Sequence, residues 1–169
     1  MALFLDLADV SVRPAVPGDE VAVTAIQVQA WGATHDATLG RAVLAQLDTE
    51  VMRERWKAAI GSVPGPGFGV LVAMDGPRLV GFAAVAPGQL LSLEVDPGHR
   101  RAGHGSRLLA AAVDRLRADG AGEITTWVLE NDTAREAFLA DCGLGPDGTE
   151  RTLAAGPRTV VERRWSAAI

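Results

Sequence analysis

The amino-acid sequence predicts an α/β protein with one mixed β-sheet and helices on both faces. Three apolar segments between residues 68 and 95 are separated only by short Asp, Gly and Pro turns, a pattern typical of an antiparallel meander. After residue 95, apolar strands alternate with segments of helical periodicity. The order β-α-α-β-β-β-α-β-α-β-β therefore indicates a mixed sheet and not a repeating βαβ array.

The first 60 residues contain one strand and a long helical region. Val10 to Arg13 alternates between apolar and polar residues, which predicts a short strand. Pro17-Gly18-Asp19 then opens a helix with apolar residues at helical spacing. A second helical region covers about residues 39–60 and is expected to break near Asp48-Thr49, where Thr49 can cap a new helix.

The later elements follow from apolar runs between Gly and Pro breaks. The strands of the meander are expected at residues 68–74, 79–86 and 90–95. Beyond them we expect a helix at 103–119, a strand at 123–129, a helix at 131–142, and strands at 149–153 and 158–165. The first of these helices is amphipathic, with one apolar face formed by Leu108, Leu109, Ala112, Val113 and Leu116.

The composition favours one domain at residues 10–169 behind an N-terminal arm at residues 1–9. A chain of 169 residues with 48% hydrophobic residues is long enough to bury a substantial core. The arm is apolar but contains Asp6 and Asp9 and lacks a basic start, so it is interpreted as an extra strand or loose arm and not as a signal peptide. No apolar run approaches the roughly 20 residues that span a bilayer, so no membrane partner is expected.

The net charge and the cysteine content restrict the expected classes of binding partner and the expected cellular compartment. The net charge of −5 argues against nucleic acid as a partner, because nucleic-acid-binding proteins usually present a basic face. Cys142 is the single cysteine, which excludes an internal disulfide and fits a reducing cytoplasm. Lys57 is the one lysine among 16 basic residues, and together with 19 glycines this suggests a GC-rich bacterial genome.

A basic, glycine-punctuated loop leads from the 90–95 strand into the 103–119 helix. Gly103 and Gly105 permit backbone angles closed to other residues and allow a ligand to approach the main chain. The first helical turn offers free N–H groups and the positive end of the helix dipole. This pattern predicts a diphosphate site, with a solvated surface turn as the alternative. Donor side chains surround the turn at Arg100, Arg101, His104 and Arg107.

Two other phosphate-binding motifs do not fit this loop. A Walker loop needs Gly-Lys-Ser/Thr, whereas Lys57 lies within a helical segment. A dinucleotide fingerprint needs a third glycine where Leu108 stands, and usually a βαβ continuation.

Two motifs follow one another in the sequence, the first at the basic loop and the second at residues 126–144. The first, Val95-x-Pro97-x-x-Arg100-x-x-Gly103-x-Gly105, resembles the acetyl-CoA motif of the GNAT family of N-acetyltransferases. The strand-helix unit at residues 126–144 resembles its second half, through Asn131, Ala134, Phe138 and Gly143. The similar element order covers residues 10–166. The resemblance implies a GNAT-like acyl-CoA N-acyltransferase fold with acetyl-CoA as co-substrate and no metal.

The resemblance also implies where acetyl-CoA binds. The strand ending near Val95 should part from the strand at 123–129, and pantetheine should bond the main chain at Leu93 and Val95. The residues expected at the pyrophosphate are Arg100, Arg101, Ala102, Gly103, His104, Gly105 and Ser106. The residues expected to flank the CoA arm are Asn131, Ala134 and Phe138.

The chemistry implied by the family is direct attack of a neutral amine on the thioester, which needs a base for the ammonium proton. Glu94 is the nearest carboxylate to the expected acetyl site and faces away from its strand neighbours; the alternative is a surface glutamate. By resemblance, Trp31 to Asp36 lies between the first two helices, near the acceptor pocket. His35 in that segment has a suitable pKa, with a solvated loop histidine as the alternative. The candidate acceptor residues are Trp31, His35 and Asp36.

The usual general acid of the family is missing from this chain. A tyrosine commonly follows the phenylalanine of the last helix, but Leu139 stands there and the chain contains no tyrosine. Cys142, one turn further along, could protonate the leaving thiolate, or it is a small buried residue at the helix end. Water could supply the proton instead.

These features predict a cytoplasmic N-acetyltransferase that moves acetyl from acetyl-CoA to a primary amine of a small molecule. One alternative is a protein or peptide acceptor. Another is a non-catalytic acyl-CoA-binding module that has lost the acid. A homodimer is a further option.

Overall fold

The structure is a computed structural model that describes residues 10–169, so the arm predicted at residues 1–9 lies outside the described residues. The predicted α/β class and element order are confirmed. In chain order the elements are β1 (Val10–Pro14), α1 (Glu20–Leu39), α2 (Arg41–Leu44), α3 (Thr49–Gly61), β2 (Gly69–Asp75), β3 (Arg78–Ala86), β4 (Gln89–Val95), a 3-10 turn (Pro97–His99), α4 (His104–Ala118), β5 (Glu123–Leu129), α5 (Thr133–Asp141), β6 (Gly145–Ala155) and β7 (Arg158–Ala168).

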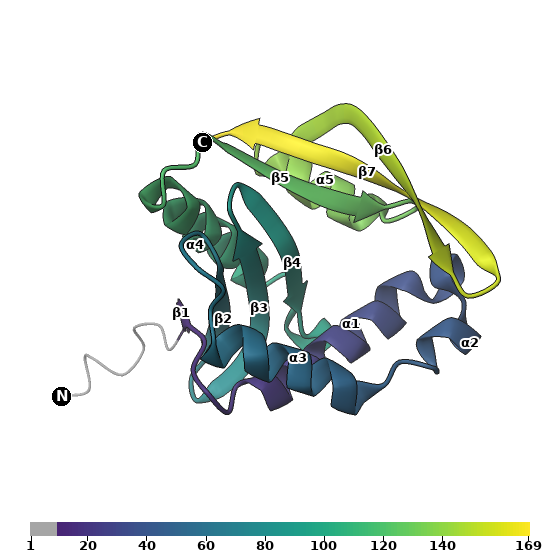
Figure 1. Cartoon of the computed structure of the whole chain (residues 1–169), viewed down its shortest axis with the longest axis horizontal. Coiled ribbons are helices and arrows are strands. Elements are labelled where there is room, and N and C mark those ends of the chain that lie inside the picture. Colours follow the sequence, from purple (N-terminus) through teal and green to yellow (C-terminus); the bar gives the residue numbers. More distant parts are fainter. Residues whose placement is uncertain (1–9) are drawn as a thin grey trace.

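One seven-stranded sheet connects these elements in the order β1-β2-β3-β4-β5-β7-β6 (Figure 1). β1 to β4 form an antiparallel half, and β5, β7 and β6 form a second antiparallel half. β4 and β5 join the halves as parallel neighbours. The sheet is therefore mixed, as the sequence predicts.

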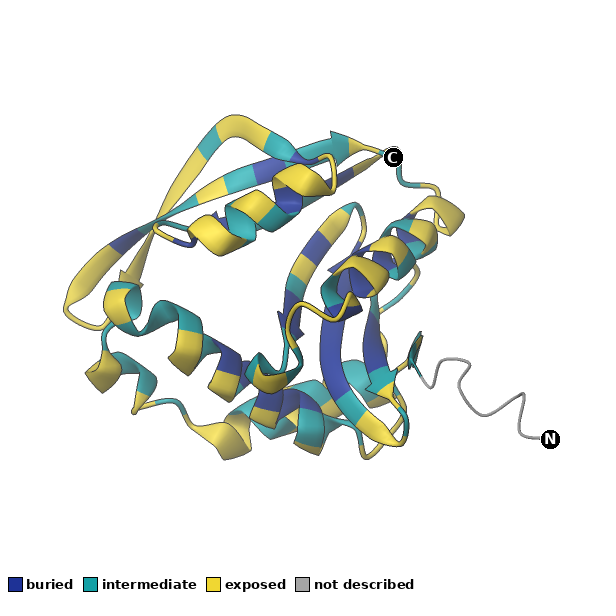
Figure 2. Cartoon of the chain, turned by 180° about the vertical axis from the view of Figure 1, so that it is seen from behind, coloured by how far each residue is buried: buried dark blue, intermediate teal, exposed yellow. Residues whose placement is uncertain are grey.

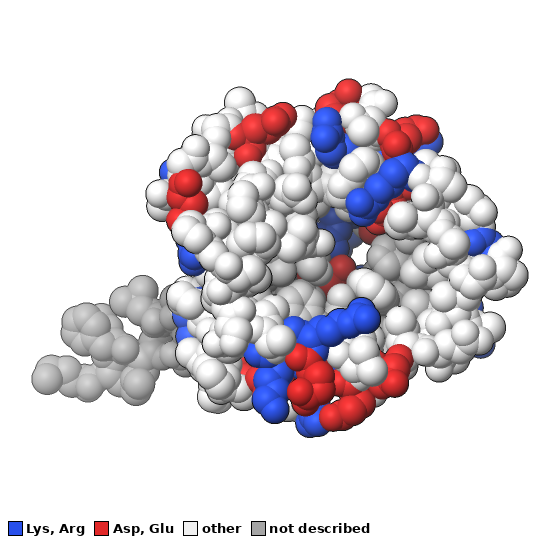
Figure 3. All heavy atoms as spheres, in the orientation of Figure 1, with Lys and Arg blue, Asp and Glu red and all other residues white. Residues whose placement is uncertain are grey.

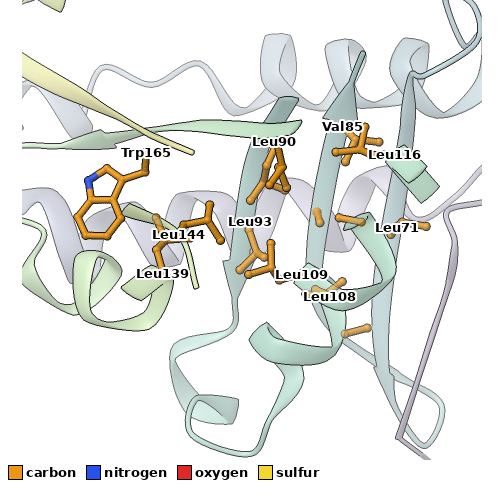
Figure 4. Packing of buried hydrophobic residues seen from close by; sticks show 14 of the residues in the cluster. Leu71, Val85, Leu90, Leu93, Leu108, Leu109, Leu116, Leu139, Leu144 and Trp165 are labelled. Atoms are coloured by element: carbon orange, nitrogen blue, oxygen red, sulfur yellow. The ribbon is translucent and has the colours of Figure 1, made fainter. Parts of the chain in front are cut away.

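The two faces of the sheet bury separate clusters. α4 and α5 cover the face with the larger core, where Leu108, Leu139 and Trp165 pack with apolar strand residues (Figure 4). α1 and α3 cover the other face, where the Trp56 ring meets Phe82 edge-on at 5.0 Å. Figure 2 shows that buried residues concentrate in the central strands and on the helix faces turned toward them. A side chain on β4 therefore belongs to the α4 face or to the α1 face.

The predicted break in the second helical region is confirmed, but its cap is different. Asp48, and not Thr49, is the N-cap of α3, because its carboxylate accepts the N–H groups of Glu50 and Val51 at 3.1 and 3.0 Å. An Asp side chain at this position satisfies two of the free donors that begin every helix.

β4 contains an irregularity that helps to end its pairing with β5. Its register with β3 runs from Ala84↔Ser92 to Val85↔Leu90, so Leu91 is an extra residue on β4. The bulge places both Leu90 and Leu93 in the larger core although they are three residues apart. Bulges bend a strand and increase its twist, which is consistent with two parallel strands that separate beyond this point.

The hairpin tip, residues 155–158 between β6 and β7, packs against the C-terminal end of α1. Arg158 Nη1 donates to the carbonyl of Ala37 at 3.2 Å. Gly156 has a φ of 59°, and a Cβ added there would lie 2.9 Å from Val43 Cγ2 on α2. The last turn of α1 contains no basic residue of its own, so the Arg158 guanidinium supplies the positive charge that favours a helix C-terminus.

Candidate active site

The candidate site lies where β4 and β5 part. Their register contains one pair, Gln89↔Thr125, and the Thr126 hydroxyl donates to the Leu90 carbonyl at 2.9 Å. Beyond these contacts the strands diverge toward their C-terminal ends (Figure 1). The separation expected from the family resemblance is confirmed. It leaves the facing main chain of β4 without a strand partner.

Alternation along β4 determines which main-chain groups face the opening. The N–H of Asp96 donates to the Val80 carbonyl of β3 at 2.8 Å. Since successive residues of a strand direct their main-chain groups to opposite edges, those of Val95 and Leu93 face the opening. These are the two residues predicted to bond pantetheine.

The basic loop after β4 presents donors at the end of the opening. Gly103 has a φ of 81°, in the left-handed region that favours glycine, and Arg107 Nη1 donates to the Ala102 carbonyl at 3.0 Å. Within α4 the N–H of Arg107 bonds to the Gly103 carbonyl, so the N–H groups of the first turn have no helical acceptor. Residues exposed around this turn are Arg100, Arg101, Ala102, Gly103, Ser106 and Arg107. Such an array suits a diphosphate.

Two predictions about this loop are wrong. Gly105 is helical and not in the left-handed region; a Cβ there would lie 3.5 Å from the Phe138 ring, so glycine allows α5 to approach α4. His104 is only 2% exposed, so its side chain cannot act as a surface donor to phosphate. Burial, followed by the charge of Arg107, holds the pKa of His104 below its usual value.

The buried His104 predicts a loss of stability in mild acid. Its pKa is lower in the folded state, so below about pH 6.5 the unfolded chain binds the proton first, and the free energy of unfolding falls as the pH falls. We expect the melting temperature to drop between pH 7.5 and pH 5.5, and to drop less in a His104→Gln variant. Thermal denaturation at the two pH values measures this difference. Equal drops in the two proteins would contradict the assignment.

The second half of the predicted CoA motif meets the first at the Gly105–Phe138 contact. Asn131 has a φ of 67° and stands exposed before α5. Asp132 then caps the helix, because its Oδ1 accepts the N–H of Arg135 at 3.0 Å. Ala134, one turn before Phe138, is also exposed. Gly105 and Phe138, which are 33 residues apart in the sequence, thus lie around one end of the opening.

The segment Trp31 to Asp36 is part of α1 and does not lie between the first two helices. Residues 33–39 contain no proline, and Gly32 costs a helix only about 1 kcal/mol, so α1 continues to Gly40. Asp36 is turned to α2, where Arg41 Nη2 lies 3.3 Å from its Oδ2. The predicted pocket residue Asp36 is therefore engaged in an ion pair with α2.

Glu94 is buried on the α1 face, opposite to its neighbour Leu93 in the larger core. It is 8% exposed, so the alternative of a surface glutamate is wrong. Arg135 Nη2 of α5 lies 3.2 Å from Glu94 Oε2. Burial raises the pKa of Glu94, while Arg135, Arg100 and the Trp31 indole act in the opposite direction.

His35 belongs to the same group of side chains. Burial lowers its pKa; the charge of Asp132 opposes this shift, and the charges of Arg135 and Arg100 reinforce it. The imidazole is half-buried and neutral at pH 7, so it can accept a proton. The Arg100 guanidinium reaches α1 beside it, where Nη2 donates to the Thr34 hydroxyl at 3.2 Å.

Arg135 is the residue of this group that the sequence reasoning missed. The available signal was its position on the last predicted helix, four residues after Asn131. We define the charged cluster as Glu94, His35, Arg100, Asp132 and Arg135. Figure 3 shows a hollow near the middle of this face with both acidic and basic atoms inside it.

Neither the position of the family's usual tyrosine nor the candidate acid Cys142 lies in the charged cluster. Leu139 is 0% exposed and packs with Leu144 and Trp165 (Figure 4). Cys142 is exposed, so its interpretation as a buried residue is wrong. It lines a different hollow, between α4 and the chain's last residues, and burial together with Asp141 raises the pKa of its thiol.

Neither a metal-binding group of side chains nor a membrane-spanning helix is found among residues 10–169. No three His, Cys, Asp or Glu side chains of this part of the chain gather in a way that could hold a metal ion. Within the same residues, no helix combines the length and apolarity needed to cross a bilayer.

A mixed sheet that opens between two parallel strands and ends there in a basic helix N-terminus defines the class of acyl-CoA N-acyltransferase folds. The model of the acetyltransferase (GNAT) family matches residues 33–144, and the chain belongs to this family of acyltransferase enzymes. The predicted family and enzyme class are thereby confirmed.

Three similar proteins extend this comparison. The mycothiol acetyltransferase of Rhodococcus opacus is 32% identical over 130 residues, which are 69% of this chain and 41% of that protein. The chain thus spans about two fifths of that relative's length. The PaiA N-acetyltransferase of Thermoplasma acidophilum, solved with coenzyme A, superposes with a TM-score of 0.81 at 16% identity, covering 96% of this chain and all of that one. YncA of Salmonella typhimurium, solved with acetyl-CoA, gives 0.71 at 19% identity, covering 95% and 94%.

Proposed function

We propose that the protein transfers the acetyl group of acetyl-CoA directly to a primary amine of a small molecule. The observation that supports this most is the opening between β4 and β5, which ends at the exposed donor loop before α4 and at the Gly105–Phe138 contact. The PaiA and YncA structures contain coenzyme A and acetyl-CoA, respectively. The R. opacus relative is a mycothiol acetyltransferase.

The residues fit acetyl-CoA as a substrate in three places. The free N–H groups of the first α4 turn, with Arg101 and Arg107, would hold the pyrophosphate. Leu93 and Val95 would bond the pantetheine amides through their main chain. Asn131 and Ala134 would flank the arm from the side of α5.

The proposed reaction needs one base and one polarising donor. The amine nitrogen forms a bond to the thioester carbon, the C–S bond breaks, and the thiolate leaves. Glu94 takes the ammonium proton, with the neutral His35 as the second acceptor in the charged cluster. The Val95 N–H polarises the carbonyl. Because a leucine replaces the usual tyrosine and Cys142 lines a different hollow, we assign protonation of the thiolate to water.

A thermal-shift titration tests the cofactor half of this proposal. At 100 times its Kd, a ligand bound only by the folded state adds about 2.7 kcal/mol, which is a rise of about 5–10 °C for a domain of this size. Acetate and AMP at equal concentration are the controls. No rise at millimolar acetyl-CoA would contradict the cofactor site.

A thiol-release assay against a panel of amines tests the reaction half. We expect acceptor-dependent release of CoA thiol, with acetylated small amines identified by mass spectrometry. Acetylation confined to a protein or peptide substrate would contradict the small-molecule acceptor. The cytoplasmic location, the bacterial origin and the homodimer stay predictions.

A further inference from the structure

The charged cluster contains two guanidinium groups, Arg135 and Arg100, that the protein's own carboxylates engage only in part. Arg135 makes one contact to Glu94, from Nη2 to Oε2, and not the two parallel contacts that a guanidinium can make to a carboxylate. Arg100 meets only the neutral hydroxyl of Thr34. Among residues 10–169, no carboxylate oxygen lies within 4.0 Å of the Arg100 guanidinium.

The other carboxylates near the cluster are already engaged by the protein. Asp132 accepts a main-chain N–H at the start of α5, where it offsets the positive end of the helix dipole. Glu162 accepts Arg151 Nε at 2.6 Å, and Glu130 Oε1 accepts the N–H of Val161 at 2.9 Å. Glu94 is engaged by one contact from Arg135 to its Oε2, and it is the carboxylate that we assign to an acceptor amine.

The two guanidinium groups approach from different elements. Arg135 comes from α5, and Arg100 comes from the loop after β4 and reaches Thr34 on α1. Both lower the pKa of Glu94 and of His35, after the larger effect of burial and, for His35, after the opposing charge of Asp132. An amine that Glu94 deprotonates therefore has both of them as neighbours.

We infer that the acceptor is an α-amino acid, whose amine lies at Glu94 and whose carboxylate binds the free edge of Arg135. This inference rests on the proposed function, since it names the acceptor of the same site. The resulting order of charges alternates: Glu94, ammonium, substrate carboxylate, Arg135. After the ammonium has lost its proton, the substrate has one negative charge, and Arg100 is a second guanidinium near it that forms no ion pair among residues 10–169.

The geometry of the Arg135 guanidinium is the reason for assigning a carboxylate to the substrate. A guanidinium presents parallel N–H groups that match the two oxygens of a carboxylate. A plain alkylamine would bring no carboxylate for the second edge of Arg135 and would place a further cation beside that guanidinium, where like charges repel.

Matched acceptor pairs test the inference in the thiol-release assay. Each of the common α-amino acids is compared with its own carboxamide, which keeps the side chain and the amine but removes the negative charge. We expect kcat/KM for the preferred amino acids to exceed that for their amides by at least tenfold. Equal use of both, or use only of amines without a carboxylate, would overturn the inference and leave the acetyltransferase proposal standing.

Variants of Arg135 locate the carboxylate contact. In Arg135→Met we expect the preference for acid over amide to fall to within about twofold, and Arg135→Lys to restore part of it. Removing this positive charge also raises the pKa of both Glu94 and His35, so the acid limb of the rate profile should move to higher pH whichever of them is the base.

The control is Arg55→Met, an exposed arginine of α3 outside the cluster, which should keep the wild-type preference. An unchanged preference in a folded Arg135→Met protein would overturn the inference. If acetyl-CoA binds but no amine of any kind is acetylated, the proposed function fails and the inference fails with it.

Discussion

Replacing Gly103 with valine is expected to weaken acetyl-CoA binding at least 100-fold. Gly103 has a φ of 81°, and an added Cβ would lie 3.2 Å from Arg107 Nη1, the group that braces the Ala102 carbonyl. A β-branched residue is strongly disfavoured at this angle. The loop must therefore change conformation and move the N–H groups at the start of α4. Titration calorimetry with acetyl-CoA measures the loss.

Gly120→Val is the matched control for this variant. Gly120 has a φ of 91° and follows α4 at its other end, with no atom within 4 Å of an added Cβ. The backbone strain is similar in kind, so both variants should lose stability, but Gly120→Val should bind acetyl-CoA like the wild type. Equal affinities in the two variants would refute the placement of the pyrophosphate.

Glu94→Gln is expected to lower kcat by about 10²–10⁴, the usual contribution of a general base, while leaving the affinity for acetyl-CoA within about threefold. The glutamine keeps the shape of the side chain and an oxygen for Arg135, but it cannot take a proton. His35→Gln is the comparison, and we expect it to cost less than about tenfold. The opposite ranking of the two variants would assign the base to His35.

The pH dependence of the reaction rate follows from the burial of Glu94. Because burial raises the pKa of Glu94, its active carboxylate form is lost at a higher pH than for an ordinary glutamate. The wild-type rate should therefore fall on acidification at a pH above the ordinary carboxyl range, and His35→Gln should keep this limb. A limb that disappears in His35→Gln would contradict Glu94 as the base.

The strands and the cofactor motif were accessible from the sequence because they depend on local signals. Turns rich in Gly, Pro and Asp separate the strands of the meander, and the strand at 123–129 is bounded as predicted. The glycines of the loop and the strand-helix unit around Asn131 are also local patterns. The facing of Glu94 followed from strand alternation alone.

The charged cluster depends on contacts between distant segments, which local patterns do not encode. Arg135 and Glu94 are 41 residues apart, and Arg100 and Thr34 are 66 apart. The burial of His104 depends on the packing of α4 over the sheet, and its polar side chain indicated a surface position. The segment from Trp31 to Asp36 was expected to lie after α1, so the length of this helix was underestimated. Its end is set by Gly40 and by the contact with the distant Arg158.

The contact between the hairpin tip and α1 has a consequence for the order in which the site is built. Arg158 bonds to the carbonyl of Ala37, 121 residues earlier in the chain. During synthesis, α1 and α2 emerge from the ribosome long before β7, so the helix bearing Trp31 and His35 lacks its contact with Arg158 until the hairpin follows. A contact of this sequence separation costs loop-closure entropy before it stabilises the fold. The C-terminal end of α1 is thus completed only after the hairpin tip at residues 155–158 has been translated, although the basic loop before α4 is synthesised earlier.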